Sequence, residues 1–175
     1  MQKNIIFSLL FSSLLIGCGN DSDDQNFQQQ TPAQKISSLE NSGEIPKLER
    51  TNTIAGIDGD KNGIRDDIDI YIEKTYPSEE QQKAVKQFAK ALQTSLLVDK
   101  EDIIAVKSVT NVSRRAISCI FEKVPNGNSP NGGSVVEEIL GATTNTKQRL
   151  IEYMALDKAL DGTVISSPKG EVCDE

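Results

Sequence analysis

The chain has 175 residues, and its 26 acidic and 19 basic residues give a net charge of −7. This balance, with no basic stripe to displace phosphate counterions, argues against a nucleic-acid partner. The absence of histidine excludes Ser-His-Asp and Cys-His catalytic groups and histidine-ligated zinc, copper or iron.

The N-terminal residues have the pattern of a targeting segment. Lys3 precedes an apolar run over residues 5–16, which is too short to span a hydrocarbon core of about 30 Å. The run ends in Leu15-Ile16-Gly17-Cys18, which resembles the lipobox of bacterial lipoproteins. The resemblance implies a lipoprotein signal peptide over residues 1–17 and a Cys18 whose thiol receives diacylglycerol. A plain secretory signal with an accidental cysteine is the alternative.

A lipobox implies a lipid anchor in the cell envelope. Several acyl chains, at about 0.8 kcal/mol for each buried methylene, make a stable membrane anchor. The residue that follows the cysteine is Gly19 and not Asp. By the enterobacterial sorting rule, this implies the outer membrane, with the domain facing the periplasm or the cell surface.

Residues 18–50 are rich in Asn, Gln, Ser and Asp and poor in apolar side chains. Such a segment buries too little surface to offset its ordering entropy, so we expect a disordered tether. Ile36 and Leu39 allow one short helical turn within it. The helical domain is then expected over residues 51–175.

From Asp66 onward the apolar residues recur with helical spacing. The spacing predicts a first helix over 66–76, which Pro77 ends. Ser78 with Gln81 forms a capping-box pattern, which predicts a second helix to about residue 98. Further helices are predicted over 102–123, 134–140 and 145–161.

The third of these helices is expected to bury one apolar stripe. Its inward residues are predicted to be Ile103, Val106, Ile117, Ile120 and Phe121. Strand patterns are weak elsewhere. The fold class is therefore mainly α: a small, irregular helical bundle with one calcium-binding loop, preceded by a disordered tether.

Cys119 and Cys173 remain once Cys18 is assigned to the lipid. An oxidising periplasm or cell surface permits a disulfide between them. It would close a loop of about 55 residues and contribute on the order of 4 kcal/mol to stability. Two free buried thiols are the alternative.

The stretch GIDGDKNGIRDDIDIYI, residues 56–72, carries oxygen-bearing side chains at short, regular intervals. In a twelve-position calcium register over 58–69, Gly63 takes the sharp turn. The ligands would be Asp58, Asp60, Asn62, the Ile64 carbonyl, Asp66 and Asp69. Ca²⁺ fits because it is a hard cation that takes six to eight oxygens and offsets the repulsion between these carboxylates. Mg²⁺ is less suited because it prefers fewer protein ligands.

This loop resembles EF-hand-type calcium loops, and the dockerin and thrombospondin type 3 forms more than the calmodulin form. An entering helix is not predicted, and position 12 is Asp69 in place of Glu. We therefore expect a single structural site and not an opening switch. The alternative is an acidic turn before a helix N-terminus, where Asp66 and Asp67 would interact favourably with the helix dipole.

The whole chain also resembles a family of small, uncharacterised proteobacterial lipoproteins. The family has an Asp/Asn-rich loop that runs into RDD, and an NT..R stretch before a Tyr. Here these motifs are residues 65–67, then Asn145-Thr146, Arg149 and Tyr153. The resemblance implies no activity.

The remaining basic residues suggest no second site. Arg114 and Arg115 are expected on a solvated helix face, and Arg149 is expected to pair locally with Glu152.

We therefore expect a lipid-anchored envelope protein with one structural Ca²⁺ that presents its surface to an envelope protein or polymer, and not an enzyme. A metal-dependent or carboxylate-based hydrolase of the envelope is the alternative. Filled calcium loops rarely leave a reactive position, and no pair of nucleophile and base is visible. A dockerin-like module that binds a cohesin-like partner would need a second copy of the loop.

Overall fold

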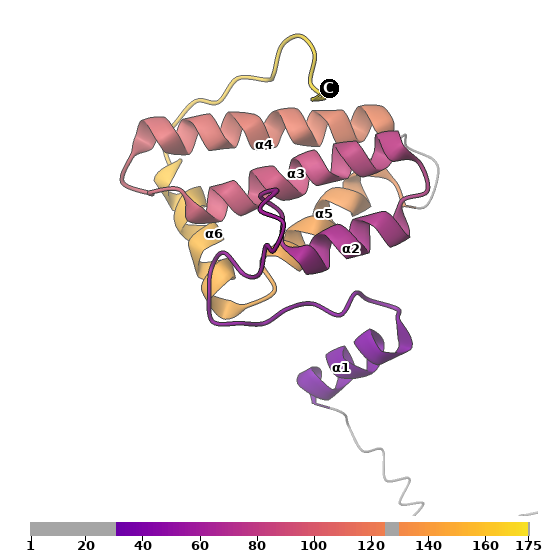
Figure 1. Cartoon of the computed structure of the whole chain (residues 1–175). Coiled ribbons are helices and arrows are strands. Elements are labelled where there is room, and N and C mark those ends of the chain that lie inside the picture. The colour runs from indigo at the N-terminus through magenta and orange to yellow at the C-terminus, as the bar shows by residue number, and fades with distance from the viewer. Residues whose placement is uncertain (1–30, 125–129, 175) are drawn as a thin grey trace, which may run out of the picture.

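The structure is a computed structural model that describes residues 31–124 and 130–174, and these residues form a helical bundle (Figure 1). The helices are α1 (Pro32–Ser42), α2 (Asp66–Thr75), α3 (Glu79–Leu97), α4 (Ile103–Lys123), α5 (Gly132–Thr143) and α6 (Lys147–Ala159). No strand occurs in these two ranges, so the predicted mainly α class is confirmed. The predicted signal peptide and Cys18 lie outside the described residues. None of the described helices has the length and apolar content that a membrane crossing requires.

Short polar side chains cap the helices, which explains why most predicted boundaries lie close to the observed ones. The Ser78 side chain accepts a hydrogen bond from the backbone N–H of Gln81 at the start of α3, as predicted. The side chain of Asp102 accepts from two backbone N–H groups of α4. For α5 the predicted range of 134–140 was too short, because the helix runs from Gly132 to Thr143. Asn131 caps this helix, and Ser134 completes the capping box from within it.

Helix α3 lies at the centre of the bundle and contacts α2, α4, α5 and α6. Figure 1 shows α3 and α4 side by side along most of their length. The core is aliphatic apart from Phe88 and Tyr76, and its most buried members include Ile68, Ile72, Val85, Ile120, Val135 and Ile139. Aliphatic packing on a central helix therefore holds the body together.

Two of the five residues predicted to face inward on α4 are exposed. Ile103 is 40% exposed and Phe121 is 47% exposed. Ile103 is the first residue of the helix. Phe121 follows the fully buried Ile120 by one residue, which turns it about 100° around the helix axis. The buried stripe is therefore narrower than predicted.

The described part of the predicted tether, residues 31–50, contains more order than its composition indicated. Thr31 and Gln34 form a capping box at the start of α1, which Figure 1 shows below the bundle. Residues 44–56, here called the strap, then run to the metal-loop region along the bundle. The carbonyl of Ala55 accepts a hydrogen bond from the Gln93 side chain of α3, at 2.7 Å. The strap is held by polar contacts, which hydrophobic spacing does not reveal.

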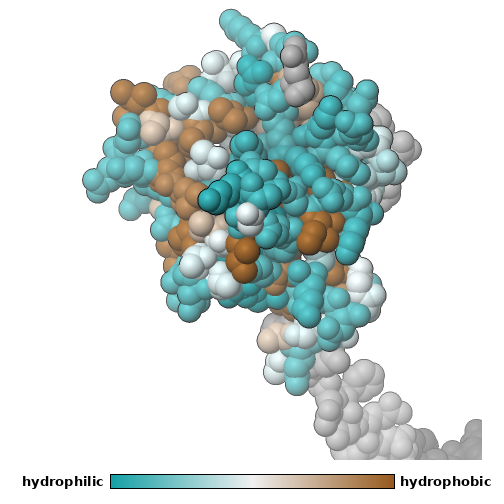
Figure 2. All heavy atoms as spheres, in the orientation of Figure 1, coloured by the Kyte–Doolittle hydropathy of each residue, from teal (hydrophilic) through white to brown (hydrophobic). Residues whose placement is uncertain are grey.

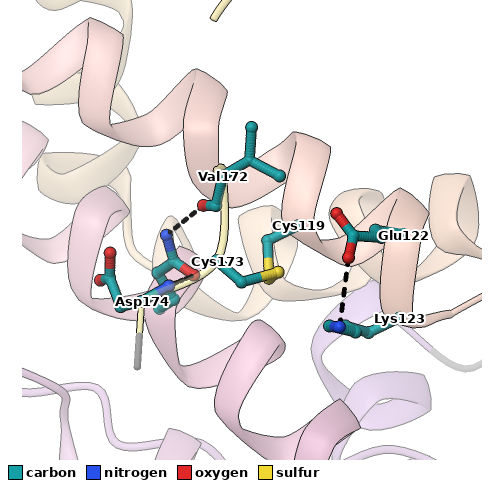
Figure 3. The surroundings of a disulfide bond; sticks show 7 residues. Cys119, Glu122, Lys123, Val172, Cys173 and Asp174 are labelled. Atoms are coloured by element: carbon teal, nitrogen blue, oxygen red, sulfur yellow. Dashed lines mark hydrogen bonds and ion pairs between the residues drawn. A yellow bond between two sulfur atoms is a disulfide. The ribbon is translucent and has the colours of Figure 1, made fainter. Parts of the chain in front are cut away.

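The C-terminal segment returns from α6 across α4 (Figure 1). Cys119 of α4 and Cys173 form a disulfide across 54 positions of sequence, with their Cα atoms 4.9 Å apart (Figure 3). The Gln87 side chain donates a hydrogen bond to the Val172 carbonyl, at 3.0 Å. The predicted cysteine pairing is therefore present, and it fixes the tail to the bundle.

Candidate metal centre

Three carboxylates of the predicted calcium loop come together before α2. Asp58, Asp60 and Asp66 each offer one oxygen, and these oxygens lie within 4.8 Å of one another. All three are hard donors, which suit Ca²⁺ or Mg²⁺ and not thiophilic metals. This group can therefore hold a metal ion.

Hydrogen bonds from backbone N–H groups to these carboxylates hold the loop in a curled conformation. The Asp58 carboxylate accepts from the N–H groups of Asn62 and Gly63, at 3.2 and 3.0 Å. Asp66 accepts from the Gly59 N–H at 2.8 Å. Gly63 has a φ of 91°, so the sharp turn predicted there is confirmed, because this backbone conformation favours glycine.

The other predicted ligands lie around this group in different ways. The Asn62 side chain donates to Asp60 at 3.0 Å and also to Asp69, and its oxygen accepts from the Ile64 N–H at 2.7 Å. One oxygen of Asp69 lies 3.1 Å from the Lys86 ammonium, and Asp69 does not belong to the group of three. The Ile64 side chain is apolar and buried. Its predicted ligand atom is the backbone carbonyl oxygen. Of the four carboxylates among the predicted ligands, the structure thus brings together three, those of Asp58, Asp60 and Asp66.

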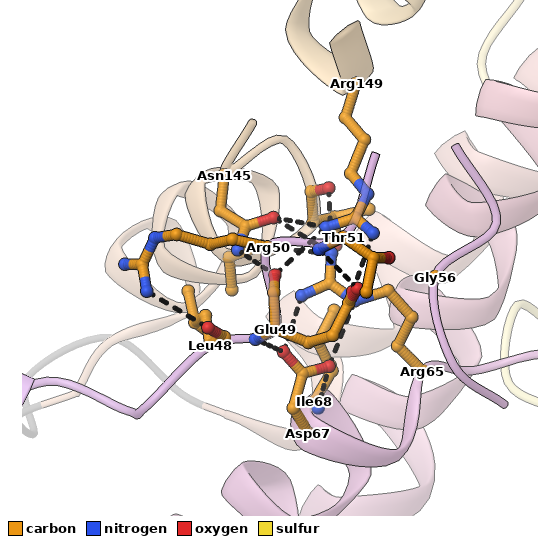
Figure 4. Close-up of polar contacts among 12 residues, drawn as sticks. Leu48, Glu49, Arg50, Thr51, Gly56, Arg65, Asp67, Ile68, Asn145 and Arg149 are labelled. Atoms are coloured by element: carbon orange, nitrogen blue, oxygen red, sulfur yellow. Dashed lines mark hydrogen bonds and ion pairs between the residues drawn. The ribbon is translucent and has the colours of Figure 1, made fainter. Parts of the chain in front are cut away.

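A second polar feature lies beside the loop, and sequence reasoning missed it. Arg65 and Arg149 are both 0% exposed, and their guanidinium groups meet in one cluster (Figure 4). Arg65 donates to both carboxylate oxygens of Asp67, at 3.0 and 2.6 Å. It also donates to the Thr143 carbonyl at the end of α5, at 3.3 Å. Arg65 thus joins the start of α2 to α5.

Arg149 makes the matching connection from α6 to the strap. Its guanidinium lies 2.7 Å from the Glu49 carboxylate and donates to the Thr53 carbonyl at 3.0 Å. It also donates to the Asn145 side-chain oxygen at 2.8 Å. The predicted local pair with Glu152 is wrong, because Arg149 points into the strap and Glu152 instead pairs with Lys100 at 2.9 Å.

This cluster balances two buried cations with two carboxylates, those of Glu49 and Asp67. Burial alone would raise the pKa of Glu49, but hydrogen bonds from Thr51 and Arg149 outweigh it and hold this pKa below its usual value. We name Arg65, Arg149, Asp67, Glu49 and Asn145 the ion-pair cluster. It ties the strap, α2, α5 and α6 together.

At Gly56 the strap backbone passes close to both arginines of the ion-pair cluster. Its φ is 71°, and a Cβ atom built on it would lie 2.5 Å from Cδ of Arg65 and 2.9 Å from Nη2 of Arg149. Only glycine allows both this backbone conformation and this approach. Four cluster residues, Arg65, Asp67, Asn145 and Arg149, stand in the RDD and NT..R stretches of the sequence.

The chain matches no described protein family, no curated protein and no solved structure. Function is therefore inferred from the loop and from the ion-pair cluster. The loop concentrates carboxylates that can bind a cation, and the ion-pair cluster fixes the loop to the helical body.

Proposed function

We propose that the protein is a lipid-anchored cell-envelope module whose loop 58–69 holds one structural Ca²⁺. The metal proposal rests on one observation: a carboxylate oxygen from each of Asp58, Asp60 and Asp66 lies within 4.8 Å of the other two. These are positions 1, 3 and 9 of the register that the sequence predicts. Without a cation, three carboxylates at this separation repel one another, and a divalent ion removes that cost.

Calcium suits this loop better than magnesium. Ca²⁺ takes six to eight oxygens in flexible geometry, whereas Mg²⁺ demands near-octahedral order. Asn62, Asp69 and the Ile64 carbonyl are the further oxygen donors of the proposal. An ion bound there would stabilise the loop before α2, in addition to the hydrogen bonds that already hold it. Its role would therefore be structural.

The lipid anchor and the envelope location are supported by the residues Leu15-Ile16-Gly17-Cys18 followed by Gly19. A partner in the envelope, a protein or a polymer, is supported by apolar side chains left exposed on the body. Figure 2 shows apolar side chains gathered along the edge where α6 and the turn between α3 and α4 lie. Exposed apolar residues of these elements are Ile104 of α4, which is 79% exposed, and Met154 of α6, which is 61% exposed.

Calcium is expected to raise the thermal midpoint of the full-length chain. Mass-action linkage gives about 2.7 kcal/mol of stabilisation when the ion is 100-fold above its Kd. The midpoint is measured with calcium, magnesium or a chelator, for the wild type and for Asp58→Asn. The matched control is Asp161→Asn, which changes an exposed acid outside the loop.

Three outcomes of this experiment have distinct meanings. Stabilisation by calcium that Asp58→Asn abolishes and Asp161→Asn preserves supports the calcium site. A larger effect of magnesium would overturn the choice of ion. A midpoint that is the same with calcium, magnesium and chelator would remove the metal from the proposal.

The anchor is tested separately with Cys18→Ser in the bacterial envelope. Wild type is expected to label with radioactive palmitate and to sediment with membranes. The variant is expected to lose both properties, because the thiol is the acceptor of the diacylglycerol. Cys173→Ser is the control, because it removes a cysteine but leaves the lipobox. Equal labelling of wild type and Cys18→Ser would refute the lipid anchor.

A further inference from the structure

A cavity opens within the bundle between α3, α4, α5 and α6. Its volume is about 140 Å³. Apolar side chains form most of its wall, among them Phe88, Leu92, Val136, Leu140, Leu156 and Leu160. An apolar protein cavity of about 150 Å³ takes up a molecule the size of benzene. This cavity is therefore large enough for an apolar group of about six carbon atoms.

A cationic groove lies beside the cavity, on a neighbouring face of α4. It has a volume of about 370 Å³ and is bounded by α4 and by residues 166–169 of the tail. Arg114, Arg115 and Lys169 line it, together with the hydroxyl-bearing Ser166 and Ser167. Among the residues that the structure describes, no acid lines this groove.

The charge of the groove is not neutralised locally. Within the described ranges, neither Arg115 nor Lys169 has a carboxylate within 4.0 Å. In a chain of net charge −7, three unpaired cationic side chains on one groove create a local positive field. Such a field attracts small anions.

Arg114 lies at the border of the two spaces, because it lines both the cavity and the groove. Its guanidinium donates to the Ile165 carbonyl at 3.2 Å, which holds its charged end beside the tail. An arginine offers an apolar stem on one side and a charged head on the other. The tail that forms the far wall of the groove is joined to α4 by the Cys119–Cys173 bond, four residues beyond Lys169.

We propose that the cavity and the groove form one binding site for a small amphipathic anion. The ligand class is a single alkyl chain of about six carbons that carries a phosphate or carboxylate group. The alkyl chain enters the bundle, and the head lies between Arg114, Arg115 and Lys169. Asp157 lines the cavity on the α6 side, so an anionic head is repelled there and is directed towards α4.

The test is a calorimetric titration of the full-length chain with butyl, hexyl and decyl phosphate. Inorganic phosphate is the head-only probe, and hexanol is the tail-only probe. Affinity is expected to rise roughly fourfold for each added methylene, because each buries apolar surface. The rise is expected to stop near six carbons, where the cavity is full. Hexanoate is the carboxylate comparison.

Two variants separate the head from the tail. Arg115→Gln is expected to weaken hexyl phosphate about tenfold through the loss of a charge-assisted hydrogen bond. Val136→Phe fills the cavity and is expected to abolish the dependence on chain length while phosphate still binds. Lys107→Gln is the matched control, because Lys107 is an exposed cation on α4 that does not line the groove.

Hexyl phosphate that binds no more tightly than both inorganic phosphate and hexanol would overturn the proposal. Equal effects of Arg115→Gln and Lys107→Gln would also overturn it, because general charge would then explain the binding. If Val136→Phe does not fold, the chain-length series on the wild type alone decides. The site shares no residue with loop 58–69, so its failure leaves the calcium proposal unaffected.

Discussion

Replacing Arg149 with alanine is expected to lower the free energy of unfolding by about 3–5 kcal/mol. The Arg149 guanidinium is fully buried and bonds to the Glu49 carboxylate and to strap carbonyls. Its removal leaves the Glu49 charge without its closest cation. Urea denaturation of wild type and variant measures the loss.

The matched control is Arg50→Ala. The Arg50 guanidinium also pairs with a glutamate, Glu40, at 2.5 Å, but the Arg50 side chain is 44% exposed. An exposed pair contributes about 0–1 kcal/mol. Similar losses for Arg50→Ala and Arg149→Ala would contradict the importance assigned to burial.

A double variant distinguishes the pair from general packing. Arg149→Met combined with Glu49→Met removes both charges and leaves apolar side chains in their place. Such replacements cost much less than breaking one side of a buried pair. The double variant is therefore expected to be more stable than the sum of the two single losses predicts. Additive losses would mean that the two side chains act independently.

Loss of the disulfide is expected to destabilise the chain by about 4 kcal/mol, from the entropy of a loop of this length. The change is the double variant Cys119→Ala with Cys173→Ala, which removes the bond across 54 positions. Thermal unfolding with and without a thiol reductant measures the effect. The double variant is expected to unfold at the same temperature in both conditions, and the wild type is expected to approach it when reduced.

The same double variant tests whether the tail contributes to the proposed anion site. Residues 166–169 form one wall of the groove, and Cys173 fixes them to α4. We expect the double alanine variant to lose affinity for hexyl phosphate while it remains folded. A wild type whose midpoint does not respond to the reductant would contradict the stabilising role of the bond.

The helices could be predicted from the sequence because their signals are local. Apolar spacing, Pro77 and the Ser78 cap all act within a few residues, and α2, α3 and α4 accordingly lie close to their predicted ranges. The disulfide could be predicted because only Cys119 and Cys173 remained once Cys18 was assigned to the lipid.

The ion-pair cluster could not be predicted in this way. Arg149 bonds to Glu49 across 100 positions of sequence, and no local pattern marks such a contact. Arg65 is also fully buried, which the sequence does not indicate because arginine is usually exposed. The ion pair between Lys86 of α3 and Asp69 is likewise a contact between separate elements, which the spacing within the loop does not predict.

The strap also determines how the body would respond to mechanical force. A pull on the chain from its N-terminal side reaches the bundle through Leu48, which packs against the core, and through Glu49 beside it. The backbone N–H of Glu49 donates to Asp67 and its carbonyl accepts from Asn145 and Arg149. These bonds end on α2 and α6, so they would share the load and break together. Tension would therefore strain the ion-pair cluster together with the apolar contact of Leu48.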